Sequence, residues 1–340
     1  MEFVCKECFS DKELKGFIIS LDNKGNCDCC KNTEVEIIRI EELFDFFKEL
    51  FDNFKVVENG ESLVSKIQGN WSLFSNLENA HNILNFVISK LDTHIQSSEI
   101  SVDFNDDIKE NIGYWSHLKE QLKWERRYLT NINLLTDDLG WDGFFESKIV
   151  LQKEDVFYRA RLHHNANADV FSEKEMYSPP KKNASAGRAN PAGIPYLYLS
   201  DNEETILYEI RAAFLDEVSI ASFSLKPEVD TEIYISDFTE VPTLFHPNEV
   251  NQKIKSTLLK QVISKDLSKP MRRYDSELDY VPTQFICEFI RIFTGVKGIK
   301  FRSSLHNVGN NLVLFDQDIM QCVNVEKVQV SKVIISSNKM

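Results

Sequence analysis

Long apolar runs are missing from this sequence of 340 residues. A segment that crosses a membrane needs roughly 20 apolar residues, and the most apolar stretch, residues 285–296, is interrupted by Glu288 and Arg291. The first residues also lack the basic and apolar regions of a secretory signal. The sequence therefore predicts a cytoplasmic protein that has no membrane partner.

The glycine-rich motifs that bind phosphate groups in the commonest nucleotide-binding folds are also missing. The sequence contains neither the Gly-x-Gly-x-x-Gly of a dinucleotide-binding fold nor the Gly-x4-Gly-Lys-Ser/Thr of a P-loop. The helical region described below has no Arg-x4-6-His nuclease motif. These absences argue against a Rossmann oxidoreductase, a P-loop ATPase and a ribonuclease.

Basic residues are scarce in the first part of the chain. The net charge is −14, and residues 1–150 contain 16 Lys and Arg against 28 Asp and Glu, which leaves 23 against 25 for the rest. A negative surface repels a phosphate backbone, so we do not expect nucleic acid as a partner. The near-neutral second part tolerates a small anionic ligand.

Cysteine is rare in most of the sequence, but five of the seven cysteines lie within the first thirty residues. Cys5 and Cys8 form one pair with two intervening residues, Cys27 and Cys30 form another, and eighteen residues separate the pairs. This spacing is typical of a structural zinc site in which two turns each supply two thiolates. We expect Zn²⁺ bound by these four residues, with Cys29 as an alternative to a neighbouring ligand.

The coarse secondary structure predicts an α+β protein of several domains. Between the cysteine pairs, residues 16–20 and the turn at 22–25 predict a short hairpin. Apolar residues at helical spacing then predict a bundle of about four helices, with candidates at 37–51, 77–91 and 106–135. We expect a zinc knuckle (1–35), a helical bundle (36–145) and a mixed α/β domain (146–340).

The third domain alternates short apolar runs with helical patterns. The predicted strands are 156–161, 196–199, 220–225, 232–235, 298–301, 312–315 and 328–330, and the predicted helices are 203–215, 250–264 and 283–293.

Polar residues that suit a dinucleotide are distributed over this third domain. Two arginines, Arg159 and Arg188, the second beside Gly187, offer planar forks for a pyrophosphate. A single carboxylate such as Glu209 can stabilise positive charge at an anomeric carbon, and Tyr198 offers an aromatic face. Structural roles without a ligand stay open for two of these residues: Arg188 can form an ion pair with Glu209, and Tyr198 can belong to the hydrophobic core.

The order of these residues resembles the RES domain family. The matching pattern is Tyr-Arg at 158–159, Gly-Arg-x-Asn-Pro-x-Gly-x-Pro-x-x-Tyr at 187–198, Thr-x3-Glu at 205–209, and Ser303 followed by Asn-Leu-Val-Leu-Phe at 311–315. The resemblance covers about residues 154–316. It implies an ADP-ribosyltransferase-like fold and an enzyme that consumes NAD⁺, as in toxins of bacterial toxin-antitoxin pairs. The N-terminal part is similar to the HEPN-like extension of some RES proteins.

The resemblance also implies roles for individual residues. The implied catalytic residues are Arg159, Glu209 and Ser303, with Ser304 as a register alternative. The implied NAD⁺-binding residues are Arg159, Arg188, Tyr198, Ser303 and Asn311. The sequence departs from the family at Arg302, where proline is common, at Ala189, where a bulkier residue is common, and in a long insertion between residues 237 and 282.

From the resemblance we expect an enzyme that cleaves the nicotinamide-ribose bond of NAD⁺, as a glycohydrolase or a phosphorylase, and acts as a bacterial toxin or phage-defence effector. Two alternatives remain. One is an ADP-ribosyltransferase that modifies a protein, and the other is a non-catalytic zinc-helical interaction module with a ligand-sensing RES domain. The expected partners are NAD⁺, an antitoxin or regulatory protein, and further copies of the chain in a homo-oligomer.

Overall fold

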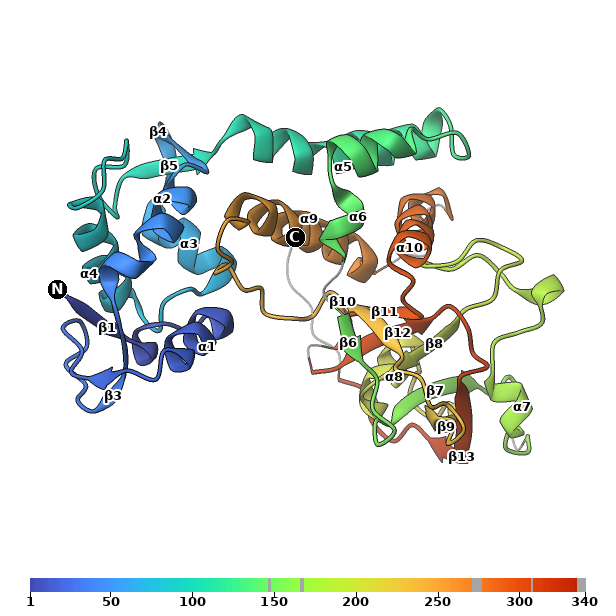
Figure 1. The fold of residues 1–340 in the computed structure, drawn as a ribbon. Coiled ribbons are helices and arrows are strands. Elements are labelled where there is room, and N and C mark those ends of the chain that lie inside the picture. The colour runs from blue at the N-terminus through green and yellow to red at the C-terminus, as the bar shows by residue number, and fades with distance from the viewer. Residues whose placement is uncertain (146–147, 166–167, 271–276, 307, 335–340) are drawn as a thin grey trace. The chain divides into compact units, whose positions relative to one another are not determined.

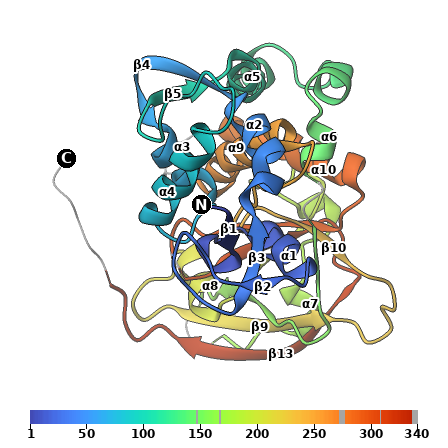
Figure 2. The same cartoon turned by 60° about the vertical axis from the view of Figure 1, so that its left-hand side comes forward.

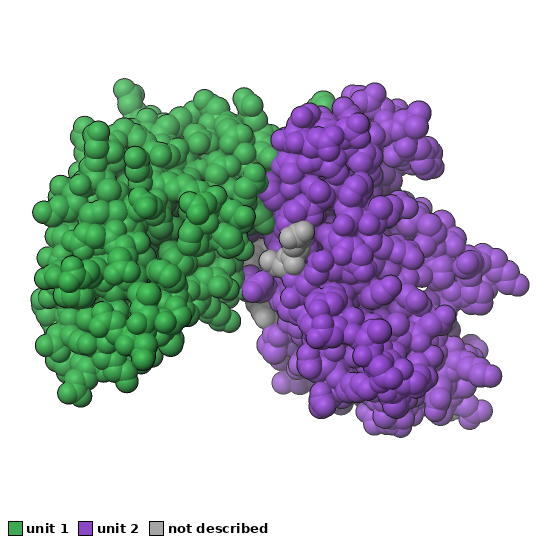
Figure 3. Space-filling view, in the orientation of Figure 1, with its two compact units in different colours: residues 1–117, 241–259 green, residues 118–240, 260–340 purple. Residues whose placement is uncertain are grey.

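We analysed a computed structural model that describes residues 1–145, 148–165, 168–270, 277–306 and 308–334 (Figure 1). The chain forms two compact units (Figure 3). Unit 1 comprises Met1–His117 and Val241–Leu259, and unit 2 comprises Leu118–Glu240 and Lys260–Met340. The three domains expected from the sequence remain a prediction, and the first residue of the third, residue 146, lies outside the described residues. No described helix combines the length and apolarity needed to cross a membrane.

The cysteine-containing segment of unit 1 combines a small sheet with a helix. Strands β1 (Phe3–Cys5), β3 (Val35–Arg39) and β2 (Lys24–Gly25) form an antiparallel sheet in the order β1-β3-β2, and a 3-10 helix, η1 (Lys6–Cys8), follows β1. The hairpin expected at 16–20 is wrong, because those residues belong to helix α1 (Lys12–Ser20). Asp11 caps this helix by accepting a hydrogen bond from the Leu14 backbone N–H, and Leu14 and Ile18, one turn apart, are buried.

The rest of unit 1 is largely helical, as the apolar spacing indicates. Its elements are η2 (Ile40–Leu43), α2 (Phe44–Phe51), β4 (Phe54–Ser62), α3 (Leu63–Trp71), α4 (Leu77–Ile88), β5 (Ser101–Phe104) and the first part of α5 (Asp106–Trp124). The antiparallel β4–β5 pair was not expected, and the helix expected at 37–51 begins later because residues 35–39 form β3. Side chains cap two of the helices: Ser62 accepts from the Ser65 backbone N–H, and Asn76 from that of Asn79.

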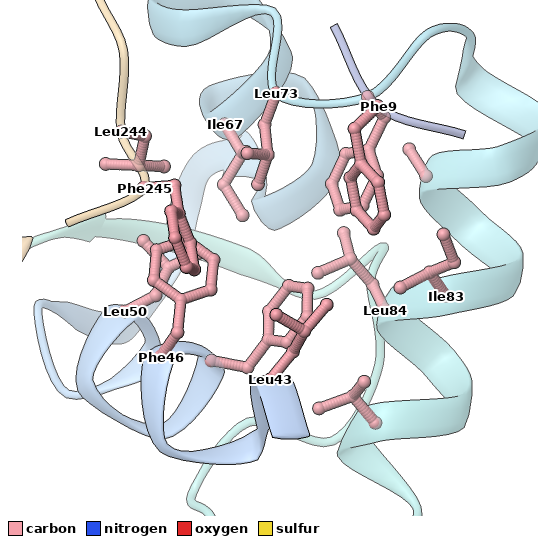
Figure 4. Close-up of a cluster of buried hydrophobic side chains, with 14 of the residues drawn as sticks. Phe9, Leu43, Phe46, Leu50, Ile67, Leu73, Ile83, Leu84, Leu244 and Phe245 are labelled. Atoms are coloured by element: carbon pink, nitrogen blue, oxygen red, sulfur yellow. The ribbon is translucent and has the colours of Figure 1, made fainter. Parts of the chain in front are cut away.

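A distant segment of the chain completes the core of unit 1. Leu244 and Phe245 belong to the same buried cluster as side chains of α2, α3 and α4, and Figure 4 shows them beside Phe46 and Leu50 of α2. The ring centroids of Phe46 and Phe245 are 5.1 Å apart in an edge-on arrangement. The carboxylate of Asp11 accepts hydrogen bonds from the backbone N–H groups of Leu244 and Phe245, at 2.6 and 3.2 Å. These contacts explain why residues 241–259 belong to unit 1.

Unit 2 is built on an eight-stranded mixed sheet with the order β13-β9-β7-β8-β12-β11-β10-β6. Its strands are β6 (Lys148–Val150), β7 (Phe157–Leu162), β8 (Leu197–Ser200), β9 (Glu217–Leu225), β10 (Tyr234–Asp237), β11 (Gly298–Arg302), β12 (Asn310–Leu314) and β13 (Met320–Gln329). All pairs are antiparallel except β10 with β11. Strands β9 and β13 run side by side at one edge (Figure 2). Six of the seven predicted runs fall largely in one of these strands, and the run 232–235 shares only its last two residues with β10. Strand β6 and most of β13 were not predicted, and the mixed α/β class is confirmed.

Helices connect and cover the strands of this sheet. They are η3 (Leu134–Asp138), α6 (Trp141–Phe144), α7 (Glu173–Met176), η4 (Lys181–Asn183), α8 (Glu203–Glu209), α9 (Val250–Ser268), η5 (Glu277–Tyr280) and α10 (Val281–Thr294). Of α9, only the part from Lys260 onward belongs to unit 2. Helix α5 ends at Trp124, earlier than the expected residue 135, and α8 ends at Glu209, earlier than the expected residue 215. The early end of α8 places Glu209 at its C-terminus, beside the loop that follows β11.

Candidate functional site

The sheet of unit 2 is split between β7 and β8. Strand β7 pairs with β9 along its whole length, from Phe157 to Leu162, but with β8 only at Tyr158 and Ser200. The guanidinium of Arg159 crosses this split and donates from Nη1 to the backbone carbonyl of Tyr198 at 3.1 Å. A side chain therefore provides a hydrogen bond where the backbone ladder is interrupted.

Arg159 is a half-buried residue whose guanidinium is partly enclosed. Burial, with Arg161 nearby, lowers the pKa of Arg159 to about 10, so the guanidinium stays charged at neutral pH. Its Nε atom is buried and has no hydrogen-bond partner among the described residues, and no described carboxylate forms an ion pair with it. A buried charge without a counter-charge is costly, and an anionic ligand would reduce that cost.

Three of the predicted residues meet at one carboxylate. Oε1 of Glu209, the last residue of α8, accepts a hydrogen bond from Oγ of Ser303 at 2.7 Å and another from Nδ2 of Asn311 at 2.8 Å. Ser303 directly follows β11, and Asn311 lies on β12 opposite Ser200 of β8. Ser303 and Asn311 are both buried. Three segments that are far apart in the sequence thus orient one acidic group.

The hydroxyl of Ser303 is fixed by its own loop. Its Oγ accepts hydrogen bonds from the backbone N–H groups of Leu305 and His306, each at 3.2 Å. With these acceptor positions used, its proton is directed to Glu209. Ser303 and Asn311 both donate to Oε1 of Glu209, and Oε2 of Glu209 has no hydrogen-bond partner among the described residues. The geometry leaves one carboxylate oxygen for a ligand while the other holds the group in place.

The loop that contains Arg188 is closed around Tyr198. The Tyr198 hydroxyl donates to Oδ1 of Asn190 at 2.7 Å and accepts from the backbone N–H of Ala189 at 3.0 Å. A Cβ atom on Gly187 would lie 2.6 Å from Oδ1 of Asn190 and 2.7 Å from the Tyr198 hydroxyl, so only glycine fits there. Burial raises the pKa of the Tyr198 hydroxyl. Tyr198 therefore shapes the loop.

The guanidinium of Arg188 is directed along the end of α9. Its Nη1 donates to the carbonyl of Leu267 at 2.6 Å. Within the described part of the chain, Arg188 and Glu209 form no ion pair. The sequence left open that Arg188 pairs with Glu209, and this ion pair is absent from the described structure.

A cavity of about 560 Å³ brings part of the predicted set together. Four predicted residues line it: Arg188, Tyr198, Glu209 and Asn311. Arg159 and Ser303 are not among the lining residues, but each contacts one that is, through the Tyr198 carbonyl and the Glu209 carboxylate. This volume is within the range of small-molecule sites.

Sequence reasoning missed much of the cavity wall. Lining residues that were not singled out include Arg211, Pro270, Glu277, Tyr280, Phe301 and Leu305. Pro270, Glu277 and Tyr280 come from the long insertion that the sequence showed only as a departure from the family. An insertion with a proline and aromatic residues was the available signal, but nothing local connects it to the distant motif residues.

The four predicted zinc ligands lie together in unit 1. The Sγ atoms of Cys5, Cys8, Cys27 and Cys30 all lie within 4.8 Å of one another. The sulfurs are separated by 3.8 Å for Cys5 and Cys8, 3.6 Å for Cys8 and Cys27, and 3.4 Å for Cys5 and Cys30. Tetrahedral coordination with a Zn–S distance of roughly 2.3 Å requires sulfurs about 3.8 Å apart. The cluster therefore has the size of a four-thiolate metal site.

The thiols of this cluster perturb one another. Hydrogen bonds from Cys5 and Cys8 lower the pKa of Cys27, whereas the hydrogen bond with Cys27 raises the pKa of Cys5 to about 12 and also raises that of Cys8. One thiolate among thiols is thus favoured and a second is not, unless a cation neutralises them. Cys29 lies outside this group of four, and its Sγ donates to Oδ1 of Asn79 at 3.5 Å.

Comparison with known proteins identifies the family. A family model described as the RES domain matches residues 156–333, more than half of the chain, and the protein therefore belongs to the RES domain family. The resemblance found in the sequence is thus confirmed for the second part of the chain, and the HEPN-like character of the first part stays a prediction.

One solved structure, of the M. tuberculosis MbcT-MbcA toxin-antitoxin complex, matches with 13% sequence identity and a TM-score of 0.30. That match covers 53% of this chain and 86% of the other. No curated protein matches the chain.

Proposed function

We propose that the RES domain cleaves NAD⁺ between nicotinamide and ribose. The observation that carries this proposal is the carboxylate of Glu209, held at the wall of a 560 Å³ cavity by Ser303 and Asn311. Cleavage of a glycosidic bond passes through an oxocarbenium-like transition state, and a fixed carboxylate stabilises its positive charge. Because the hydrogen bonds already fix the carboxylate, little reorganisation is needed when charge develops.

The proposed reaction breaks one bond at C1′ of the nicotinamide ribose and forms another. The bond between C1′ of the ribose and the pyridinium nitrogen breaks, and its electron pair stays on nitrogen, so that neutral nicotinamide leaves. A nucleophile then bonds to C1′ and loses its proton to solvent. Water as the nucleophile gives ADP-ribose, phosphate gives ADP-ribose 1″-phosphate, and a protein side chain gives an ADP-ribosylated target.

The two arginines serve the anionic part of the substrate in this proposal. Arg188 lines the cavity, and Arg159 is a half-buried residue without a described counter-charge. We assign both to the pyrophosphate, since guanidinium groups bind phosphate oxygens through paired hydrogen bonds. Access of the pyrophosphate to Arg159 requires the guanidinium to exchange its hydrogen bond with the Tyr198 carbonyl.

The cysteine cluster has a structural role in this proposal. Four thiolates close a tetrahedral zinc site and leave no position for a substrate, so Zn²⁺ would stabilise the fold around β1, β2 and α1 without taking part in the reaction.

Because NAD⁺ depletion is lethal to a cell, we also propose that the protein acts as a toxin or defence effector in the cytoplasm. It would then be restrained by an antitoxin or regulatory protein, and a homo-oligomer is its expected assembly.

The purified full-length chain, incubated with NAD⁺, tests the chemistry directly. We expect release of free nicotinamide, and chromatography of the second product in buffers with and without phosphate separates hydrolysis from phosphorolysis. Labelled NAD⁺ added to a cell lysate reports ADP-ribosyl transfer as label on protein. Loss of NAD⁺ without nicotinamide, or cleavage into two mononucleotides, would refute the proposal.

A further inference from the structure

The insertion and the first residues of α10 together contribute a wall to the candidate site. We call residues 267–270 and 277–284, at the end of α9 and the start of α10, the α9–α10 wall. Thr283 Oγ1 donates to the carbonyl of Arg188 at 2.6 Å, and Gln284 Nε2 donates to the carbonyls of Gly187 and Asn190 at 2.8 and 3.0 Å. The wall therefore holds the loop that carries Arg188.

The same wall also contacts the second motif loop. Ser268 Oγ, at the end of α9, donates to the carbonyl of Arg302 at 2.8 Å, one residue before Ser303. Pro270, Glu277 and Tyr280 line the 560 Å³ cavity together with Glu209. The α9–α10 wall is thus part of the site itself, connected on one side to the arginine loop and on the other to the serine loop.

Tyr280 has a special place in this wall, because it lines two hollows. One is the 560 Å³ cavity with Glu209, and the other is a smaller hollow of about 130 Å³, and Arg188 lines both as well. Two ion pairs border the smaller hollow, Lys119 with Asp266 at 2.8 Å and Lys123 with Asp279 at 2.6 Å. The Tyr280 carbonyl lies 3.0 Å from Thr283 Oγ1, but the one proton of that hydroxyl is better placed on the Arg188 carbonyl at 2.6 Å.

Comparison of the aromatic residues in the cavity singles out Tyr280. Tyr198 uses its hydroxyl twice within the arginine loop and packs against Gly187, and Phe301 is only 2% exposed on β11. Tyr198 and Tyr280 are both half-buried, and Tyr280, at the end of η5, belongs to the α9–α10 wall. Because the arginine loop does not use its hydroxyl, we single out Tyr280 as the ring for a ligand to cover.

The charges of the two rings of NAD⁺ indicate which of them Tyr280 would bind. The nicotinamide ring of NAD⁺ is a positively charged pyridinium, whereas adenine is neutral at pH 7. Cations are attracted to the face of a tyrosine ring. The cavity is lined by two carboxylates, Glu209 and Glu277, and by two guanidinium groups, Arg188 and Arg211, so it offers groups of both signs to a ligand with a cationic ring and an anionic pyrophosphate. We infer that Tyr280 binds the nicotinamide ring of NAD⁺ by stacking on its cationic face. This inference rests on the proposed NAD⁺ cleavage and adds to it a substrate-contacting residue outside the family motifs.

Calorimetric titration in a Glu209→Gln background, which prevents turnover, tests this inference. Tyr280→Ala should weaken NAD⁺ binding by about tenfold, because the stacking surface is lost. Tyr280→Phe keeps the ring and should stay within about twofold of the Glu209→Gln protein. ADP-ribose lacks nicotinamide, so its binding should be unchanged in all three proteins. Tyr234→Ala, at an exposed tyrosine of β10 that does not line the cavity, is the matched control.

The possible failures are distinguishable. Equal NAD⁺ affinity in the Tyr280→Ala and parent-background proteins would overturn the inference about Tyr280 alone. Equal weakening of NAD⁺ and ADP-ribose would also overturn it, because that result means a general loss of cavity shape. If the background protein binds neither ligand, and the unsubstituted chain releases no nicotinamide, the proposed function fails together with the inference.

Discussion

The two units of this protein hold their buried polar groups in different ways. In unit 1, the thiols of Cys5, Cys8 and Cys27 are buried against one another, and the hydrogen bonds among them are long. In unit 2, the carboxylate of Glu209 is held by two short hydrogen bonds from Ser303 and Asn311. The first centre has the composition of a metal site, in which a cation would balance deprotonated thiols, whereas the second is held by neutral donors. This difference predicts that metal removal and side-chain substitution will have separate consequences.

The largest expected effect concerns the metal centre of unit 1. Cys8 is fully buried, and Cys8→Ser should abolish zinc binding and destabilise the protein by several kcal/mol, since metal-binding energy is folding energy in such sites. The measurement is thermal unfolding combined with metal analysis of the purified protein. Cys29→Ser is the control, because Cys29 lies outside the cluster and should keep both the metal and the parent midpoint. A Cys8→Ser protein with a full complement of zinc would contradict the assignment.

A smaller effect is expected at the second centre. Ser303→Ala removes one of the two donors to Glu209 and should slow nicotinamide release by roughly 10- to 100-fold, with little change in the unfolding midpoint. The assay is steady-state kinetics with NAD⁺. Ser304→Ala is the control, since Ser304 is the exposed neighbour and the alternative register of the family serine. If Ser304→Ala were the slower enzyme, the register of the motif would have to be moved by one residue.

The smallest effect is expected where the α9–α10 wall supports the arginine loop. Gln284→Ala removes the side-chain donor to the Gly187 carbonyl and one of the two donors to the Asn190 carbonyl. It should raise the KM for NAD⁺ by about threefold to tenfold, with a smaller change in kcat. Glu288→Ala, at an exposed position on the same helix, checks for general effects on α10. An unchanged KM would show that the loop keeps its position without this wall.

Local patterns predicted most strands of the sheet in unit 2 and the cysteine cluster, but not β6 or the short helices. Apolar runs such as 197–199 and 312–314 are buried strands of a sheet and give a clear signal. The spacing of the cysteine pairs predicted which four sulfurs meet. The hairpin at 16–20 was wrong because the capping residue Asp11 and the buried pair Leu14 and Ile18 favour a helix, which the β-like run of Phe17, Ile18 and Ile19 concealed.

Contacts between distant segments could not be predicted in this way. The motif order suggested Glu209, Ser303 and Asn311 as members of one site, but that they share a single carboxylate oxygen follows from the pairing of β8 with β12 and the early end of α8. Tyr280 reaches the cavity from an insertion, where no periodicity or motif marks it. In the same way, Leu244 and Phe245 belong to the core of unit 1 although they lie between strands β10 and β11 of unit 2 in the sequence.

Nicotinamide release by the Glu209→Gln protein tests the central claim most directly. The substitution keeps the shape of the side chain and removes its charge, so the account predicts that release from NAD⁺ falls by at least about a thousandfold while the unfolding midpoint changes little. Glu203→Gln, at an exposed position in the first turn of the same helix, should release nicotinamide at the parent rate. A Glu209→Gln protein that releases nicotinamide as fast as the parent would contradict the account.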